Sequence, residues 1–484
     1  MKKAIVIGSG FSSLSAACYL AKAGLEVEIF EKNTTVGGRA RQLVRDGFTF
    51  DIGPSWYWMP DIFEKFFAEF GKQPSDYYQL NKLNPAYKIF FKDDEITIGD
   101  CMDQICLEFE RIEAGSSNQL RSFIKKAQDN YDIAINKVVL KPGISPLELV
   151  TKDTVLRLDQ FFKTISQEVR KRFDNPKLIS TLEFPVLFLG AKPSNTPSFY
   201  SFMNFADFGL GTWHPEGGMY QVIRAMADLA KELGVTIHTD HSIDKILVLD
   251  GVICGVNTRG KNVTSDYVVS GADYHHSETL LDKKYRQYSE NYWQTRTYAP
   301  SSLLFYIGFD KKLENVNHHN LFFDTDFELH AKEIYDHPQW PTNPLFYANF
   351  PSITDSSMAP NGCENGFFLV PIAPGLEDTP ELRAQYFDIV MDRFESITNQ
   401  VVRNSIIFKE SFCVKDFIEQ YNSFKGNAYG MANTLKQTAF LRPNLKSSKV
   451  KNLFFTGQLT VPGPGVPPSL ISGKLVADLL TKNL

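Results

Sequence analysis

The chain of 484 residues lacks three features that would point to common classes of protein. Its six cysteines include no CxxC pair and are too few and too scattered for a disulfide scaffold. It has no run of 18 apolar residues, so we expect no membrane-spanning helix. It has no excess of positive charge, because 51 Lys and Arg face 56 Asp and Glu and leave a net charge of −5. This balance argues against a nucleic-acid partner. The few, scattered cysteines make a cytoplasmic, reducing location the simplest expectation.

Two kinds of catalytic signature are missing as well. No GxSxG elbow supports nucleophilic catalysis. The adjacent pairs His275-His276 and His318-His319 have no partner spacing typical of a metal site, so we expect no metal. Aromatic residues are plentiful instead, with 39 Phe, 20 Tyr and 5 Trp making up 13% of the chain. This content predicts either a large core or a site for an apolar ligand.

The N-terminus has the pattern of a βαβ unit that binds a dinucleotide. The apolar run 4–7 predicts a buried strand, Gly8-Ser9-Gly10 a tight turn, and the residues up to Gly24 a helix. The glycines let the backbone approach a pyrophosphate at the helix N-terminus. Ser13 stands at the third fingerprint position, where glycine or alanine is usual. Glu31 follows the second strand, 27–30, where a carboxylate would bind a ribose hydroxyl and repel a 2′-phosphate.

Further glycine-rich segments lie at both ends of the chain. In 36–40, Gly37 and Gly38 permit close backbone approach and Arg39 can pair with phosphate or flavin oxygens. Near the C-terminus, a strand at 452–457 precedes a loop rich in proline and glycine and a helix from about Ser469.

The middle of the chain mixes helices and strands. Residues 60 to 215 are expected to be mostly helical, with one amphipathic helix over 155–173. A helix is expected over 217–234, and a β-hairpin over 246–256 because Asp250-Gly251 joins two apolar runs. Strands are expected over 267–272, 303–307 and 367–372.

Several of these segments resemble those of a known family. Val36-Gly37-Gly38-Arg39-Ala40 and the segment 47–55 are similar to the FAD-binding N-terminus shared by amine oxidases, protoporphyrinogen oxidases and carotenoid desaturases. The match is best to the bacterial phytoene-desaturase type of carotenoid desaturase. Blocks at 213–219, 265–273, 452–458, 462–467 and 472–474 also resemble that family and occur in its order along the whole chain.

The resemblance implies an α/β fold with FAD as cofactor. A Rossmann-like FAD-binding domain of the amine-oxidase and carotenoid-desaturase superfamily would be built from residues 1–100, 215–285 and 440–484. Residues 101–214 and 286–439 would form a discontinuous substrate domain of mixed sheet and helices, with a possible membrane contact.

The resemblance also implies which residues contact the cofactor. These are Gly8, Ser9, Gly10, Phe11, Ser12, Ser13, Glu31, Lys32, Gly37, Gly38, Arg39, Ala40, Gly53, Pro54, Ser55, Ile243, Gly271, Gly457, Gln458, Gly465, Val466 and Pro467. Gln458 departs from the acidic or small residue that is usual in related flavoproteins. No catalytic base is identified; Asp51 and Glu216 lie within family motifs, and we expect structural hydrogen bonds from both. Trp56-Tyr57-Trp58 is expected either to line a substrate tunnel or to be ordinary core.

The implied activity is FAD-dependent desaturation of a carotenoid, by hydride transfer from a polyene to the flavin. We favour 3′,4′-desaturation of a 1′-hydroxy-γ-carotene-like substrate. Phytoene desaturation, carotenoid isomerisation and a non-catalytic prenyl-lipid-binding role are the alternatives, whereas the block 462–468 argues against an amine or protoporphyrinogen oxidase. The electron acceptor would be oxygen or a quinone. The predicted helix has a basic face with Lys163, Arg170, Lys171, Arg172 and nearby Lys177. Such a face is more commonly just solvated; the alternative is peripheral contact with the inner face of a membrane, from which a carotenoid would be drawn.

Overall fold

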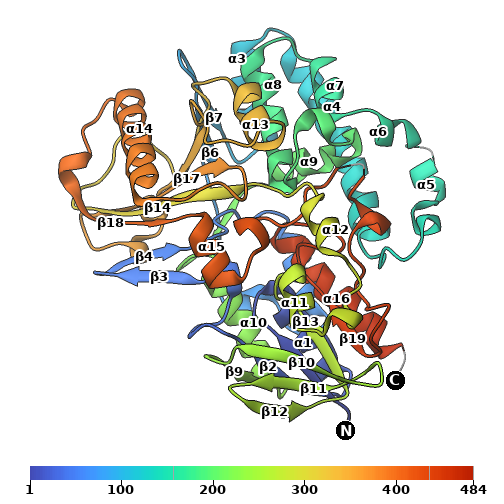
Figure 1. Cartoon of the computed structure of the whole chain (residues 1–484). Coiled ribbons are helices and arrows are strands. Elements are labelled where there is room, and N and C mark those ends of the chain that lie inside the picture. Colours follow the sequence, from blue (N-terminus) through green and yellow to red (C-terminus); the bar gives the residue numbers. More distant parts are fainter. Residues whose placement is uncertain (156, 435, 483–484) are drawn as a thin grey trace.

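A five-stranded parallel sheet carries the N-terminal turn near its centre. The computed structural model describes residues 1–155, 157–434 and 436–482 (Figure 1). The strands hydrogen-bond in the order β19 (Leu453–Phe455), β13 (Tyr267–Ser270), β1 (Lys3–Ile7), β2 (Glu26–Phe30) and β9 (Thr236–His238). The two ends of the chain therefore meet in one sheet, and the predicted βαβ unit is confirmed.

Both faces of this sheet are covered, as its apolar strands require. One face packs against α1 (Phe11–Lys22), α10 (Tyr220–Glu232) and α16 (Val466–Thr481). The other packs against an antiparallel sheet of β10 (Ile243–Leu249), β11 (Val252–Thr258) and β12 (Lys261–Thr264). The predicted hairpin is confirmed, and Asp250 and Gly251 both have positive φ in its turn.

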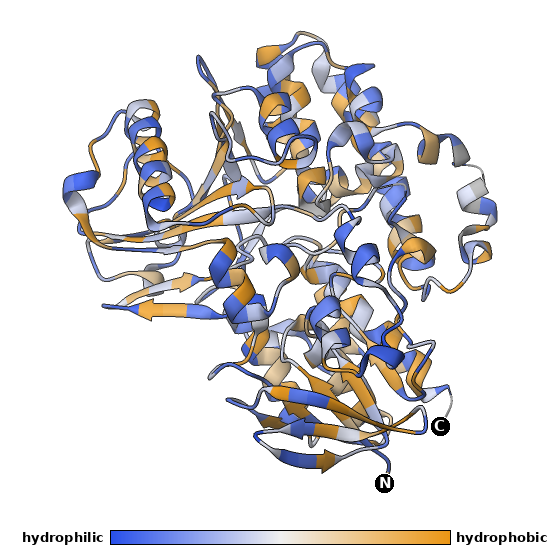
Figure 2. Ribbon diagram, in the orientation of Figure 1, coloured by the Kyte–Doolittle hydropathy of each residue, from blue (hydrophilic) through white to orange (hydrophobic). Residues whose placement is uncertain are grey.

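A second, seven-stranded sheet is mixed. Its order is β18 (Ile406–Phe412), β14 (Ser301–Phe309), β17 (Glu364–Ile372), β16 (Phe346–Asn349), β15 (His319–Phe322), β6 (Tyr87–Phe90) and β7 (Glu95–Ile98). Neighbours are antiparallel except β15 and β6. One face packs against α14 (Pro380–Thr398), along which hydrophobic and hydrophilic residues alternate (Figure 2). The other face turns toward the helices of the 102–208 segment.

That segment contains α3 (Met102–Ile112), α4 (Ser116–Ile133), α8 (Pro176–Glu183) and α9 (Phe202–Phe208). The prediction of one continuous helix over 155–173 is wrong. The structure has α5 (Lys152–Val155), α6 (Leu158–Phe162) and α7 (Ile165–Arg170), and residue 156 and the side chains of Val155 and Leu158 lie outside the described part.

The break between α6 and α7 has a local and a long-range cause. Lys163 is extended, and the Thr164 side chain accepts from the backbone N–H of Gln167, which caps a new helix. The N–H of Ile165 donates to the carbonyl of Thr196, 2.9 Å away, so a segment thirty residues on holds the break in place.

The remaining elements connect the two sheets. They are β3 (Gln42–Arg45), β4 (Phe48–Asp51), α2 (Pro60–Ala68), β5 (Leu80–Lys82), β8 (Trp213–Pro215), α11 (Tyr274–Thr279), α12 (Glu290–Gln294), α13 (Phe327–Tyr335) and α15 (Val414–Tyr421). The mostly helical expectation for 60–215 missed the hairpin of β6 and β7. These strands hydrogen-bond into the second sheet although their numbers fall within 1–100. The α/β fold, with one parallel sheet and a second, mixed sheet, agrees with the sequence analysis, and the exact domain division stays a prediction.

Candidate active site

One cavity of about 580 Å³ extends from the turn after β1 to the second sheet. Every residue that the sequence analysis assigned to cofactor contact lines it, with the exception of Ser13. These residues come from eight separate stretches of the chain, which the fold brings to one place.

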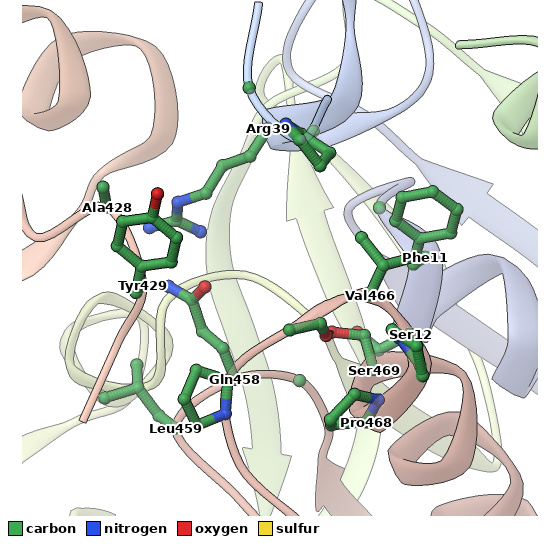
Figure 3. Close-up of a pocket in the computed structure, with 18 of the residues that line it drawn as sticks. Phe11, Ser12, Arg39, Ala428, Tyr429, Gln458, Leu459, Val466, Pro468 and Ser469 are labelled. Carbon is green, nitrogen blue, oxygen red and sulfur yellow. The ribbon is translucent and has the colours of Figure 1, made fainter. Parts of the chain in front are cut away.

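Two helix N-termini open into the cavity. Gly10 precedes α1 and Gly465 precedes α16, and neither end is capped by a side chain of its N-cap residue. In Figure 3, Phe11 and Ser12 of α1 lie beside Val466 and Ser469 of α16. A Cβ built on Gly10 would meet no atom within 4 Å, so the glycine leaves the turn open to a ligand. The first turn of α1 offers backbone N–H groups, whereas α16 offers that of Val466, because Pro467 and Pro468 have none. Together with the positive ends of two helix dipoles, these donors form a site for an anion such as a pyrophosphate.

Glu31 fixes the shape of this turn. Its side chain is 3% exposed, and one carboxylate oxygen accepts from the backbone N–H of Ser9 at 3.0 Å and from the Ser9 hydroxyl at 2.7 Å. The other accepts from the backbone and side-chain nitrogens of Asn33, both at 2.9 Å. Both carboxylate oxygens of Glu31 therefore accept hydrogen bonds within the protein. Its contact with a ribose remains a prediction.

Arg39 is a half-buried cation that makes no ion pair with any described carboxylate. It donates to the Ser423 hydroxyl at 3.0 Å and to the carbonyl of Asn427 at 3.4 Å, while its Nε has no partner among the described residues. The surrounding hydrogen bonds turn the Gln458 amide oxygen toward the guanidinium, 3.1 and 3.2 Å from its terminal nitrogens. Burial lowers the pKa of Arg39. A cation with a buried donor that has no partner among the described residues fits a bound anion, so the residues present fit FAD.

Ser13 is the one predicted contact that the geometry does not support. Its hydroxyl is buried under β13 against Gly271 and has no hydrogen-bond partner among the described residues. Ser13 supports the packing of α1 on the sheet, and Gly271 provides the space for its side chain.

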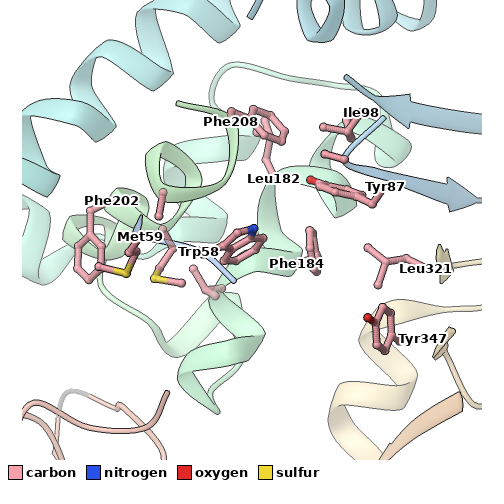
Figure 4. Close-up of a cluster of buried hydrophobic side chains, with 14 of the residues drawn as sticks. Trp58, Met59, Tyr87, Ile98, Leu182, Phe184, Phe202, Phe208, Leu321 and Tyr347 are labelled. Carbon is pink, nitrogen blue, oxygen red and sulfur yellow. The ribbon is translucent and has the colours of Figure 1, made fainter. Parts of the chain in front are cut away.

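Beyond the glycine turns the cavity becomes aromatic and apolar. Trp56 and Trp58 line it, whereas Tyr57 is buried in the core and donates to or accepts from the Tyr78 hydroxyl at 2.8 Å. The Trp56 ring stacks on His319 with ring centroids 4.1 Å apart, and burial holds the pKa of His319 well below its usual range. Figure 4 shows Trp58, Met59 and Phe184 in the same buried cluster. Trp56 and Trp58 therefore line the cavity and Tyr57 belongs to the core, while the use of this cavity as a substrate tunnel stays a prediction.

Asp51 and Glu216 do not line the cavity. Asp51 accepts from the backbone N–H groups of Met219 at 2.7 Å and Tyr220 at 3.0 Å, at the start of α10. Burial raises the pKa of Asp51 to about 6. Its role in the fold is structural, while the exposed Glu216 has no side-chain hydrogen bond in the described part of the chain.

The sequence analysis missed the loop that faces Arg39. Ser423, Asn427 and Tyr429 surround the guanidinium and Gln458, and Figure 3 shows Tyr429 beside both. The only local signal is a pair of glycines, Gly426 and Gly430, around this loop.

Comparison with known proteins agrees with this geometry. Residues 11–481 match the flavin containing amine oxidoreductase family. The sequence is 42% identical to a carotenoid 3,4-desaturase of Haloarcula japonica, over 99% of this chain and 98% of that protein. It is 30% identical to a zeta-carotene-forming phytoene desaturase of Myxococcus xanthus, over 99% of this chain and 94% of that protein. The fold is similar to that of an oxidoreductase from Methanosarcina mazei, with a TM-score of 0.64, 17% identity, and 98% and 100% of the two chains covered.

The chain belongs to the flavin containing amine oxidoreductase family and, within it, to the carotenoid desaturases. It is an FAD-dependent oxidoreductase, as the sequence predicted. Among the described residues, no helix is both long enough and apolar enough to cross a membrane.

Proposed function

We propose that this protein introduces C=C bonds into a carotenoid and that its substrate is a 1′-hydroxy-γ-carotene-like polyene, desaturated at C3′,C4′. The observation that carries the proposal is a single cavity that joins the dinucleotide cradle to an aromatic, apolar arm. The full-length identity to a carotenoid 3,4-desaturase supports the position of the new bond.

FAD, when bound, supplies the acceptor for a hydride. The residues of this chain bind and orient the reactants. Arg39 and the two helix N-termini would hold the cofactor's anionic part, and the walls formed by Trp56, Trp58 and Phe184 would align the polyene and exclude water. Positive charge that develops on the polyene is spread along its conjugated chain, so the reaction does not require a strong dedicated base.

The cavity wall also suggests how a carotenoid enters. Part of this wall is the 134–148 segment together with Phe161, and the same stretch of chain exposes large apolar side chains to solvent. The exposed fractions are 69% for Ile144, 76% for Leu147, 63% for Val150 and 76% for Phe162. We propose that this stretch, called the entry segment (residues 140–162), inserts into the interface of a membrane that holds the carotenoid.

The basic face predicted from the sequence is a weaker candidate for this contact. Four of its five cations already form ion pairs with carboxylates of the protein. The pairs are Lys163 with Asp159 at 3.1 Å, Arg170 with Glu183 at 3.1 Å, Arg172 with Glu168 at 2.9 Å and Lys177 with Asp93 at 3.0 Å. We propose peripheral attachment at the cytoplasmic face through the entry segment, with oxygen or a quinone as electron acceptor.

Expression in cells that accumulate one carotenoid tests the reaction. Cells that make 1′-hydroxy-γ-carotene should yield a product two hydrogens poorer, with its absorption shifted to longer wavelength. Conversion of phytoene, with the hydroxylated compound left unchanged, would make the protein a phytoene desaturase. Conversion of neither substrate by flavin-loaded protein would overturn the proposal.

A further inference from the structure

Two hydroxyl groups in the cavity wall are buried without a hydrogen-bond partner among the described residues. They are Ser302 Oγ, near the start of β14, and the hydroxyl of Tyr335, at the end of α13. Other hydroxyls of the same wall are paired: Ser55 with Tyr347 at 2.9 Å and Tyr200 with Thr438 at 2.8 Å. Buried hydroxyls in folded proteins almost always have a partner, so two unpaired ones in a binding cavity point to a ligand that supplies it.

The contacts around Ser302 and Tyr335 place the two residues on neighbouring parts of the wall. Ser302 lies opposite Pro371 of β17, and the Pro371 carbonyl is 2.8 Å from Nε2 of His330, which precedes Tyr335 on α13. The loop of Tyr429 touches both sides. The N–H of Ala428 donates to the carbonyl of Pro300, two residues before Ser302. Burial raises the pKa of Tyr335, and electrostatic repulsion from the nearby Tyr429 phenol raises it further.

This part of the wall adjoins the end of the cavity that binds the cofactor. Figure 3 shows Tyr429 beside Arg39 and Gln458. The next residue, Gly430, is so close to Gln458 that a Cβ there would lie 2.8 Å from its Cγ. Tyr429 therefore lies between the unpaired hydroxyls and the residues that surround the Arg39 guanidinium.

We propose that Ser302 and Tyr335 are specificity-determining residues that together bind an alcohol oxygen of the substrate. The inference rests on the proposed function and adds how the site selects its substrate. An alcohol both donates and accepts, so it can pair with both hydroxyls at once. In a 1′-hydroxylated carotenoid only three bonds separate the oxygen from C3′. The oxygen must therefore lie close to the reacting bond, at the end of the cavity where these hydroxyls are found.

A hydrocarbon substrate would leave both hydroxyls buried and unpaired. Each unpaired buried hydroxyl disfavours binding by enough to lower affinity about 10-fold or more. We therefore expect wild-type holoenzyme to prefer the alcohol over its deoxygenated analogue by about 10- to 100-fold in kcat/KM.

A competition assay tests the assignment. Holoenzyme is given equal amounts of 1′-hydroxy-γ-carotene and the analogue with hydrogen in place of the hydroxyl, and both products are quantified by mass. Ser302→Ala and Tyr335→Phe should each lower the preference for the alcohol about 10-fold, and the double variant should lose most of it. Tyr386→Phe is the matched control, because it removes a buried hydroxyl that is paired with the carbonyl of Pro341 and does not line the cavity.

The outcomes separate this inference from the proposed function. Conversion of neither compound by wild type would reject the proposed function itself. Conversion of both compounds with no preference for the alcohol, or an unchanged preference in the double variant, would overturn the role of Ser302 and Tyr335 and leave the desaturase intact. Binding of the alcohol from detergent micelles, measured without turnover, should weaken in the double variant in parallel with the change in preference.

Discussion

The hydroxyl of Ser13 occupies the space that a side chain on Gly271 would need. A Cβ built on Gly271 would lie 2.0 Å from Ser13 Oγ, closer than any two such atoms can approach. The fingerprint position where glycine or alanine is usual thus holds a larger residue, and Gly271, directly after β13, leaves the space for its side chain.

This relationship predicts a rescue. Gly271→Ala should destabilise the fold by about 1–3 kcal/mol and reduce flavin retention, because α1 must move away from β13. Ser13→Gly removes the clashing hydroxyl, so the double variant Ser13→Gly, Gly271→Ala should recover most of the loss. Thermal unfolding and the flavin content of purified protein measure both effects. A double variant no better than Gly271→Ala would show that the clash is not the cause.

Glu31→Gln should weaken FAD retention about 10-fold or more. The amide can no longer accept from donors on both sides, so it loses its charge-assisted bonds to Ser9 or to Asn33. Glu28→Gln is the control, since Glu28 lies on β2, the strand that ends just before Glu31, pairs with Lys3 and His238, and does not line the cavity. The ratio of flavin to protein after gel filtration reports the result. Equal flavin content in the two variants would remove Glu31 from cofactor binding.

Asp207 gives the stability of the protein a defined pH dependence. It is fully buried and bonded to the Tyr87 hydroxyl at 2.7 Å, and burial raises its pKa to about 8. The unfolded chain gives up this proton near pH 4. This carboxyl therefore makes folding less favourable as pH rises from about 4 to about 8, by on the order of 5 kcal/mol, and has no further effect above that.

Asp207→Asn should remove that dependence. Relative to wild type, the variant should gain stability between pH 5 and pH 8, as measured by the denaturant midpoint at each pH. Asp174→Asn, which changes an exposed carboxyl, is the control and should have the same denaturant midpoint as wild type at pH 5 and at pH 8. A constant difference between Asp207→Asn and wild type across this range would mean that the carboxyl titrates normally in the folded protein.

The entry segment can be tested separately from catalysis. The double variant Leu147→Glu, Phe162→Glu should reduce flotation with anionic lipid vesicles several-fold, because it replaces apolar side chains that would insert into the membrane by carboxylates. Both side chains are about three-quarters exposed, so their replacement should change the stability of the fold little. Leu249→Glu is the control: Leu249 is 67% exposed but lies on the β10 hairpin, which is well below α5 and α6 in Figure 1. If all three proteins float equally, the membrane is bound elsewhere or not at all.

The parts of the fold that the sequence predicted are those with strong local signals. The Gly8–Gly10 turn, the Asp250-Gly251 hairpin and the C-terminal glycine loop each need backbone conformations that few residues adopt. The prediction of one helix over 155–173 was wrong because the spacing of hydrophobic residues carries no information on the cap at Thr164. It carries none either on the hydrogen bond to Thr196, which forms only in the folded chain.

The cofactor end of the site was predictable for the same reason, and the substrate end was not. Ser302, Tyr335 and Tyr429 come from a strand, a helix and a loop that are far apart in sequence. A serine or tyrosine in such elements has no distinctive pattern around it. Only the fold shows that the hydroxyls of Ser302 and Tyr335 are buried in the wall of one cavity, with no hydrogen-bond partner in the described part of the chain.

The measurement that tests the central claim most directly is a single turnover without oxygen. Purified FAD-loaded protein is mixed anaerobically with 1′-hydroxy-γ-carotene, and the flavin absorbance and the mass of the carotenoid are followed together. The account predicts loss of the oxidised flavin absorbance in proportion to a product two hydrogens lighter. A changed polyene spectrum with unchanged mass and oxidation state would show an isomerase, and no change in either would contradict the assignment as a carotenoid desaturase.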